Sequence, residues 1–174
     1  MNKELKKIAE ITLNLLSKKS WNILSLKEVK QKSKVKLFDI LINNKQELLN
    51  NINAYFDYCL SLQIKNLEDS NHKDIIFEIL MMRFDILQNN RKAVLSVFNS
   101  FKHKPQELIL LLPQLLDSII SIIGHAKISN RGFIGQIKIK GIFIIYISTF
   151  LVWMKDESSS LEKTMKVLDT YLNQ

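Results

Sequence analysis

The sequence predicts one all-helical domain, and three observations support this prediction. Only 4 glycines and 2 prolines occur in 174 residues, so residues that interrupt helices are scarce. Hydrophobic residues make up 47% of the chain and charged residues 24%, which is the balance of a globular protein with a buried core. Apolar side chains recur three and four residues apart, which is the period of an amphipathic helix. We therefore expect an all-α fold of about nine helices.

Three helices are predicted within the first 50 residues, a longer one followed by two short ones. Residues 3–18 carry a continuous apolar stripe. Ser25 and Glu28 have the spacing of a capping box, which marks the start of a second helix. A polar cluster at residues 32–34 ends it, and a third short helix is expected over residues 35–42.

The rest of the chain is predicted to form longer helices. Asn44 and Glu47 repeat the cap pattern and begin a helix that runs to about residue 67. Pro113 is expected to start or kink a helix, and Ser159 with Glu162 to cap the last one. Further helices are expected over residues 74–88, 90–101, 106–123, 132–155 and 161–172. These elements are expected to form one continuous unit, with a head at residues 1–50 and a body at 51–174.

Charge and cysteine content limit the setting of the protein. The net charge of +8 favours nucleic acid and anionic membrane surfaces alike. A single cysteine, Cys59, excludes an internal disulfide framework and indicates a reducing, cytoplasmic setting, with peripheral contact at the inner membrane as a further option. The most apolar run, residues 141–154, is shorter than the roughly 20 residues that span a bilayer, so we interpret it as a helix buried on nearly all sides.

No group of side chains suited to catalysis stands out in the sequence. His72, His103 and His125 lie far apart at predicted loops or breaks and have no partner at metal-ligand spacing. Cys59 falls on the apolar stripe of a helix, which favours a small core residue over a nucleophile. Neither a glycine-rich phosphate loop nor a nucleophile elbow occurs. We therefore predict a protein that is not an enzyme, with no cofactor and no metal.

Residues 25–49, SLKEVKQKSKVKLFDILINNKQELL, resemble the DNA-binding signature of the TetR family of regulators. Residues 45–49 match the family's Lys-Glu-x-Leu-Leu start of its fourth helix. Lys34 stands where the family has a turn glycine, and the following segment is a few residues short, with Phe38, Leu41 and Ile42 in place of its aromatic pair.

This resemblance implies a helix-turn-helix head, with a shortened, apolar third helix that offers few groups to base edges. The candidate phosphate contacts are Lys27, Lys32, Lys34, Lys36 and Lys45. A solvated basic face is the alternative interpretation of these lysines. The segment 34–42 is also a candidate for membrane contact, because it combines lysines with apolar residues.

Tyr146, Thr149, Trp153 and Asp156 form the pattern Tyr-x-x-Thr-x-x-x-Trp-x-x-Asp in the C-terminal part of the chain. This pattern resembles that of the lipid-binding accessory family of coenzyme Q (ubiquinone) biosynthesis. The resemblance implies a TetR-like fold, a dimer formed by the last helices, and an apolar pocket for a lipid or isoprenoid quinone intermediate that is presented to a hydroxylase. The candidate lining residues are Phe84, Leu87, Phe98, Leu115, Ile119, Ile142, Tyr146 and Phe150, with plain core packing as the alternative for each.

Three functional hypotheses follow from the sequence. The first is a non-catalytic lipid- or quinone-binding accessory protein of ubiquinone biosynthesis, and we favour it because the C-terminal pattern is better preserved than the recognition helix. The second is a TetR-type, ligand-responsive transcriptional regulator that binds DNA as a homodimer. The third is a structural or interaction module with a filled core and neither ligand nor DNA.

Overall fold

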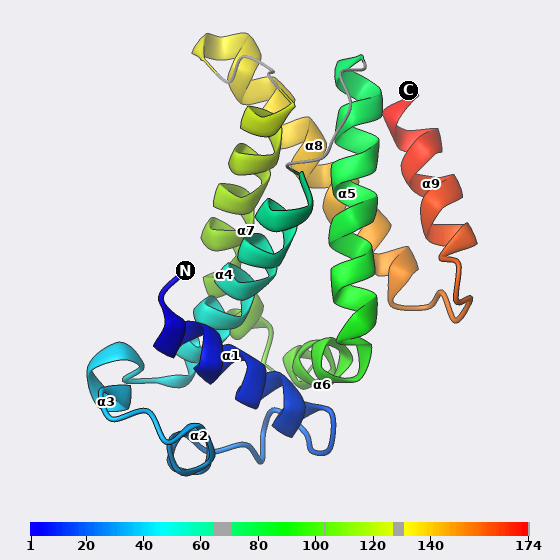
Figure 1. Ribbon diagram of the computed structural model, residues 1–174. Coiled ribbons are helices and arrows are strands. Elements are labelled where there is room, and N and C mark those ends of the chain that lie inside the picture. Colours follow the sequence, from blue (N-terminus) through cyan, green and yellow to red (C-terminus); the bar gives the residue numbers. More distant parts are fainter. Residues whose placement is uncertain (65–70, 103, 127–130, 174) are drawn as a thin grey trace. The chain divides into compact units, whose positions relative to one another are not determined.

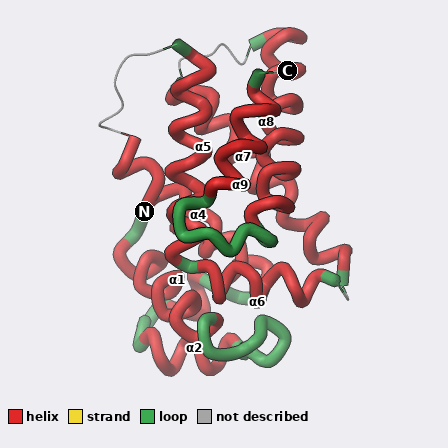
Figure 2. Tube along the Cα trace, turned by 90° about the vertical axis from the view of Figure 1, so that its right-hand side faces the viewer, coloured by secondary structure: helices red, strands yellow, loops and turns green. Residues whose placement is uncertain are grey.

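A computed structural model describes residues 1–64, 71–102, 104–126 and 131–173 of the chain. The described residues form nine α-helices and no strand, which confirms the predicted all-α class (Figure 1). The helices are α1 Lys3–Leu16, α2 Leu26–Ser33, α3 Phe38–Leu41, α4 Lys45–Gln63, α5 His72–Asn89, α6 Arg91–Phe101, α7 Pro105–His125, α8 Gly132–Trp153 and α9 Glu162–Leu172. Figure 2 shows these helices joined by loops.

The chain divides into two compact units, each built from two separate segments. The first unit comprises Met1–Cys59 and Ile86–Leu115, and the second comprises Leu60–Asp85 and Leu116–Gln174. Residues 1–50, the predicted head, therefore lie entirely within the first unit.

The first unit is organised around α1, which packs against α2 and α6. Asn2 caps α1 by accepting a hydrogen bond from the Glu4 amide at 2.8 Å. The connection from α1 to α2 is tied to α6, because the Ser96 hydroxyl donates to the Lys19 carbonyl at 3.1 Å and accepts from the Trp21 amide at 3.0 Å. These bonds hold the α1–α2 connection, which leads into α2, against α6.

The second unit contains an aromatic column and a buried arginine. The rings of Phe84 and Tyr146 stack with centroids 5.6 Å apart, and the Phe150 and Trp153 rings continue the column at 5.2 Å from each other. Arg83 is fully buried, and its Nε donates to the Tyr146 hydroxyl at 3.1 Å. This hydrogen bond offsets part of the cost of burying the guanidinium group.

Two predicted cap positions are confirmed and one is wrong. The Glu28 amide donates to Ser25 Oγ at 3.2 Å, and the Glu47 amide donates to Asn44 Oδ1 at 2.8 Å. Ser159 does not cap α9. The amide of Thr164 donates instead to the Asp156 carboxylate at 2.9 Å, so the acceptor lies eight residues upstream, which is beyond the reach of the local capping pattern.

Other differences concern helix ends and exposure. The third helix spans only Phe38–Leu41, and α7 runs through Pro113 to His125. The predicted end of the fourth helix and most of the loop before Arg131 lie outside the described residues. The prediction that the apolar run is buried on nearly all sides is wrong, because Ile144 and Leu151 on α8 are exposed.

Two helices, Gln106–His125 and Gly132–Trp153, are long and apolar enough to cross a membrane. That criterion uses length and composition alone, and core helices of water-soluble proteins meet it as well. It therefore does not establish a membrane span.

Candidate nucleic-acid interface and a polar pocket

The turn between α2 and α3 contains a residue with an unusual backbone conformation. Lys34 ends α2 in the left-handed conformation, with φ of +53° and ψ of +31°, and its amide donates to the Lys30 carbonyl at 3.0 Å. Only glycine adopts this conformation without a steric cost from Cβ. The resemblance described above implies a glycine at this place, and a left-handed turn would account for that preference; Lys34 adopts this conformation although it has a Cβ.

The short third helix divides its side chains between the core and solvent. Phe38 and Ile42 are buried, whereas Leu37 is 49% exposed and Ile40 is 74% exposed. Half of the apolar residues in the proposed membrane-contact segment 34–42 thus belong to the core. A test of membrane contact by substitution of Phe38 would therefore report on folding instead.

Four of the five lysines predicted to contact phosphate are solvent-exposed on α2 or the turn that follows it: Lys27, Lys32, Lys34 and Lys36. Lys30 on α2 is also exposed, and it pairs with Asp39 on α3. This ion pair joins the two helices and partly neutralises the positive charge between them. A small pocket of about 330 Å³ lies at the same place, and its lining includes Lys27, Lys30 and Asp39.

Lys45 is placed differently from the other four lysines. Its Nζ donates to the Trp21 carbonyl at 2.6 Å and lies 5.0 Å from the centroid of the Trp21 ring. Burial lowers the pKa of Lys45, and the nearby Glu107 carboxylate opposes this shift. The side chain therefore fixes the start of α4 to the connection between α1 and α2.

The predicted apolar lining residues are distributed over both units. Leu87, Phe98 and Leu115 belong to the first unit, and Phe98 among them is only half-buried. The other five belong to the second unit and are buried: Phe84, Ile119, Ile142, Tyr146 and Phe150. The ring contacts bring Phe84, Tyr146 and Phe150 together. Their role as a ligand-binding set stays a prediction.

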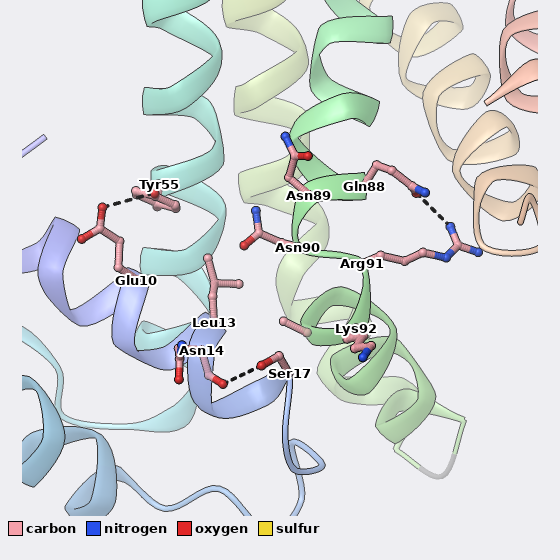
Figure 3. Close-up of a pocket in the computed structure, with 11 residues that line it drawn as sticks. Glu10, Leu13, Asn14, Ser17, Tyr55, Gln88, Asn89, Asn90, Arg91 and Lys92 are labelled. Carbon is pink, nitrogen blue, oxygen red and sulfur yellow. Dashed lines mark hydrogen bonds between the residues drawn. The ribbon is translucent and has the colours of Figure 1, made fainter. Parts of the chain in front are cut away.

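A larger pocket of about 580 Å³ lies within the first unit, and the sequence analysis missed it (Figure 3). It is formed by α1, α4 and the corner where α5 passes into α6. The lining residues are Glu10, Leu13, Asn14, Ser17, Tyr55, Gln88, Asn89, Asn90, Arg91, Lys92 and Ala93. The run of amides at residues 88–90 is the one sequence signal that marks this place, because three amide side chains interrupt the apolar period of the helix.

Hydrogen bonds organise parts of the pocket wall. The Tyr55 hydroxyl donates to the Glu10 carboxylate at 3.3 Å, and Arg91 donates to the Gln88 side chain at 3.2 Å. Burial raises the pKa of Tyr55, as do the Cys59 thiol and the Glu10 carboxylate, so the phenol stays protonated and remains a donor.

The residues that the structure describes include no arrangement of side chains suited to a metal ion. No group of three His, Cys, Asp or Glu side chains there could hold a metal ion. His72 and His125 lie at helix ends, where a ring nitrogen of each approaches a backbone carbonyl, and His103 falls outside the described residues.

Comparisons with known proteins identify the class of fold. No protein-family model matches the sequence, and no curated protein matches it. A TetR transcriptional regulator from Nitrosomonas europaea ATCC 19718 superposes with a TM-score of 0.76, covering 99% of this chain and 97% of its own, at 20% identity. A tetR-family transcriptional regulator from Streptomyces coelicolor superposes with a TM-score of 0.60, covering 96% and 80%, at 12% identity.

These likenesses show that the chain has a TetR-like fold, as predicted. They do not show membership of the coenzyme Q accessory family, which stays a prediction. The four residues that carried that resemblance also have structural positions in the second unit. The Tyr146 hydroxyl accepts a hydrogen bond from Arg83, and the Asp156 carboxylate caps α9. Thr149 and Trp153 are buried.

Proposed function

We propose that this protein is a non-catalytic, DNA-binding transcriptional regulator of TetR type that acts in the cytoplasm. The observation that carries the proposal is the geometry of the head, residues 1–50. A short α2, a left-handed turn and a short α3 present four exposed lysines: Lys27, Lys32, Lys34 and Lys36. A helix-turn-helix segment with a cluster of cations suits the backbone of duplex DNA. The structural likeness to two regulators over nearly the whole chain supports it.

Phosphate contacts should dominate the binding energy in this proposal. The third helix turns Leu37, Asp39 and Ile40 toward solvent. Apolar side chains can contact a thymine methyl group, but they cannot hydrogen-bond to base edges, and a carboxylate is repelled by phosphate. We therefore expect a smaller ratio of specific to nonspecific affinity than a longer recognition helix would give, with a strong dependence on salt.

The partner implied by this function is a second copy of the chain. Exposed residues on α8 follow the alternating spacing of three and four residues that two packed helices share. They are Ile134, Ile137, Gly141, Ile144 and Leu151, and the half-buried Ser148 continues the series. A dimer would place two heads on one duplex, which is how helix-turn-helix proteins read paired half-sites.

The lipid-presenting role in ubiquinone biosynthesis has less support than the regulator role. Its implied partners, a quinone intermediate and a hydroxylase, draw no support from the likeness to regulators. The residues that suggested it have packing, hydrogen-bonding or capping positions in this chain, which account for them without a lipid ligand.

Fluorescence anisotropy with labelled duplexes tests the regulator proposal. The duplexes are the DNA upstream of the chain's own gene and a random sequence of equal length. We expect binding to the first at lower protein concentration. The double variant Lys32→Glu with Lys36→Glu should lower affinity by about tenfold or more and reduce the slope of log K against log salt by about 2, the value for two lost phosphate contacts.

The matched control is the double variant Lys155→Glu with Lys163→Glu, since both lysines are exposed on the second unit and the change in net charge is the same. It should bind nearly as well as the unmodified protein. Equal losses in both double variants would mean that net charge alone governs the interaction. That result, or no binding by the unmodified protein at low salt, would contradict the proposal.

A further inference from the structure

The pocket of about 580 Å³ in the first unit has no part in the DNA contacts proposed above. It is lined by residues of α1, α4 and the α5–α6 corner, whereas the exposed lysines lie on α2 and the turn after it. Its volume falls within the range of about 300–1,000 Å³ that is usual for small-molecule sites. Most of the residues that line it nevertheless carry polar side chains, with Leu13 and Ala93 as the aliphatic exceptions.

Neutral hydrogen-bonding side chains are the most numerous kind among the residues that line this pocket. Asn14 extends from α1, and Asn89 and Asn90 come from the α5–α6 corner on another side (Figure 3). A side-chain amide offers two donors and an acceptor with two lone pairs. Ser17 and Tyr55 add hydroxyl oxygens that can accept, because their own protons are donated to the Asn14 carbonyl and the Glu10 carboxylate.

The charged residues of the pocket have both signs, with the Glu10 carboxylate on one wall and Arg91 and Lys92 on the other. Glu10 accepts from Tyr55 on one wall. Arg91 on the other wall is directed toward Gln88, to which it donates (Figure 3). An anionic ligand would therefore face the Glu10 carboxylate, and a cationic ligand would face Arg91 and Lys92. An uncharged ligand meets neither penalty.

We propose that this pocket binds an uncharged, hydroxyl-rich molecule of the size of a mono- or disaccharide. Each hydroxyl of such a ligand both donates and accepts, so it matches the side-chain amides of Asn14 and Asn89 and the acceptor oxygens of Asn90 and Tyr55, whose donors also bond the Ile86 carbonyl and Glu10. The aliphatic side chains of Leu13 and Ala93 contact the carbon skeleton between the hydroxyls.

Occupancy of the pocket has a mechanical consequence for the first unit. The ligand would bridge α1 and the start of α6, and α6 already holds the α1–α2 connection through Ser96. A bound ligand therefore stabilises one placement of α1 relative to α6. An effect of the ligand on DNA affinity rests on the proposed function, whereas binding itself does not.

Isothermal titration calorimetry on the full chain tests the binding directly. The neutral probes are glucose, maltose, myo-inositol and glycerol, and the charged comparators are glucose 6-phosphate and glutamate. We expect saturable binding of at least one neutral probe and weaker binding of the comparators. Asn14→Leu and Asn89→Leu should each weaken that binding by about tenfold, because a leucine leaves ligand hydroxyls without partners.

Asn99→Leu is the matched control, because Asn99 is an exposed asparagine on α6 that does not line the pocket. It should bind like the unmodified protein, and thermal melting of all three variants checks that they fold. Three results would overturn the proposal: no saturable binding of any neutral probe up to about 20 mM, binding of charged comparators alone, or equal affinity in the pocket and control variants. The calorimetry contains no DNA, so a failure of the neutral probes to bind is distinct from a failure of the regulator proposal.

Discussion

Lys34 shows how one residue can satisfy a backbone requirement at a steric cost. Its φ of +53° lies in the left-handed region, where an L-residue with Cβ is disfavoured by roughly 1 kcal/mol or more. The turn nevertheless forms, because Val29 and Phe38 on either side of it are buried and the Lys34 amide is hydrogen-bonded. Under the proposed function, the charge of Lys34 would add a phosphate contact that glycine would not supply.

Replacement of this lysine by glycine should therefore stabilise the protein. We expect Lys34→Gly to raise the free energy of unfolding by about 1 kcal/mol, measured by urea denaturation. Lys32→Gly removes the same charge two residues earlier, inside α2, and should lower the free energy of unfolding by about 0.5–1 kcal/mol. If both variants lose stability to the same extent, the left-handed conformation at Lys34 carries no cost.

At the scale of the element, α9 depends on a cap that lies outside the helix and its immediate flank. Asp156 is fully buried and accepts hydrogen bonds from the amide and the hydroxyl of Thr164, at 2.9 and 2.8 Å, and from Ser158. Burial alone raises the pKa of this carboxyl, but the hydrogen bonds outweigh it and lower the pKa to about 2. The folded state therefore favours the ionised form.

Removal of this carboxylate should destabilise the protein in a pH-dependent manner. Asp156→Ala should lower the free energy of unfolding at pH 7 by on the order of 2 kcal/mol. Because the folded pKa lies below the ordinary 3.8, the stabilisation is complete above that value and is lost as the pH falls toward about 2. The difference between the two proteins in urea denaturation should shrink over that interval.

Glu157→Ala provides the comparison, since Glu157 is the exposed neighbour of Asp156. It should change stability by less than about 0.5 kcal/mol at any pH. A loss for Asp156→Ala that is constant from pH 5 to pH 2 would show that the residue acts through packing rather than through its ionised carboxylate.

The caps show how far local sequence patterns reach. Ser25 and Asn44 were predictable because each acts on an amide three residues away, within the span of one helical turn. The Asp156 cap joins residues eight apart across a loop, and only the packed loop brings them together. The apolar period predicted that α8 exists, but a helix apolar on all sides gives no sign of which face will be buried.

At the scale of the whole molecule, composition and helical period were enough to predict an all-α fold, which the described helices confirm. The polar pocket was not predictable in the same way. Its walls come from segments around residues 10–17, 55 and 88–93, and their approach depends on how α1, α4 and α6 pack. Sites built from separated segments become visible only once tertiary contacts are known.

The exposed face of α8 indicates how two copies of the chain could associate. Ile137, Ile144 and Leu151 recur every seven residues, and Gly141 between them has open space beyond its Cα. A second helix could therefore approach closely at Gly141 and bury the isoleucines on either side. An apolar stripe of this length left in water favours association with a matching surface, and an identical chain supplies one.

Light scattering coupled to size-exclusion chromatography tests this surface. We expect the unmodified protein to elute as a dimer and Ile144→Lys to elute as a monomer, because two lysines brought together by symmetry would repel each other in an apolar contact. Ile109→Lys is a closely matched control, since Ile109 on α7 is 63% exposed, as is Ile144. It should remain a dimer. If all three proteins are dimers, the contact lies on another surface. If the unmodified protein is a monomer, two heads are not held together, and the protein cannot bind two DNA half-sites in the way proposed above.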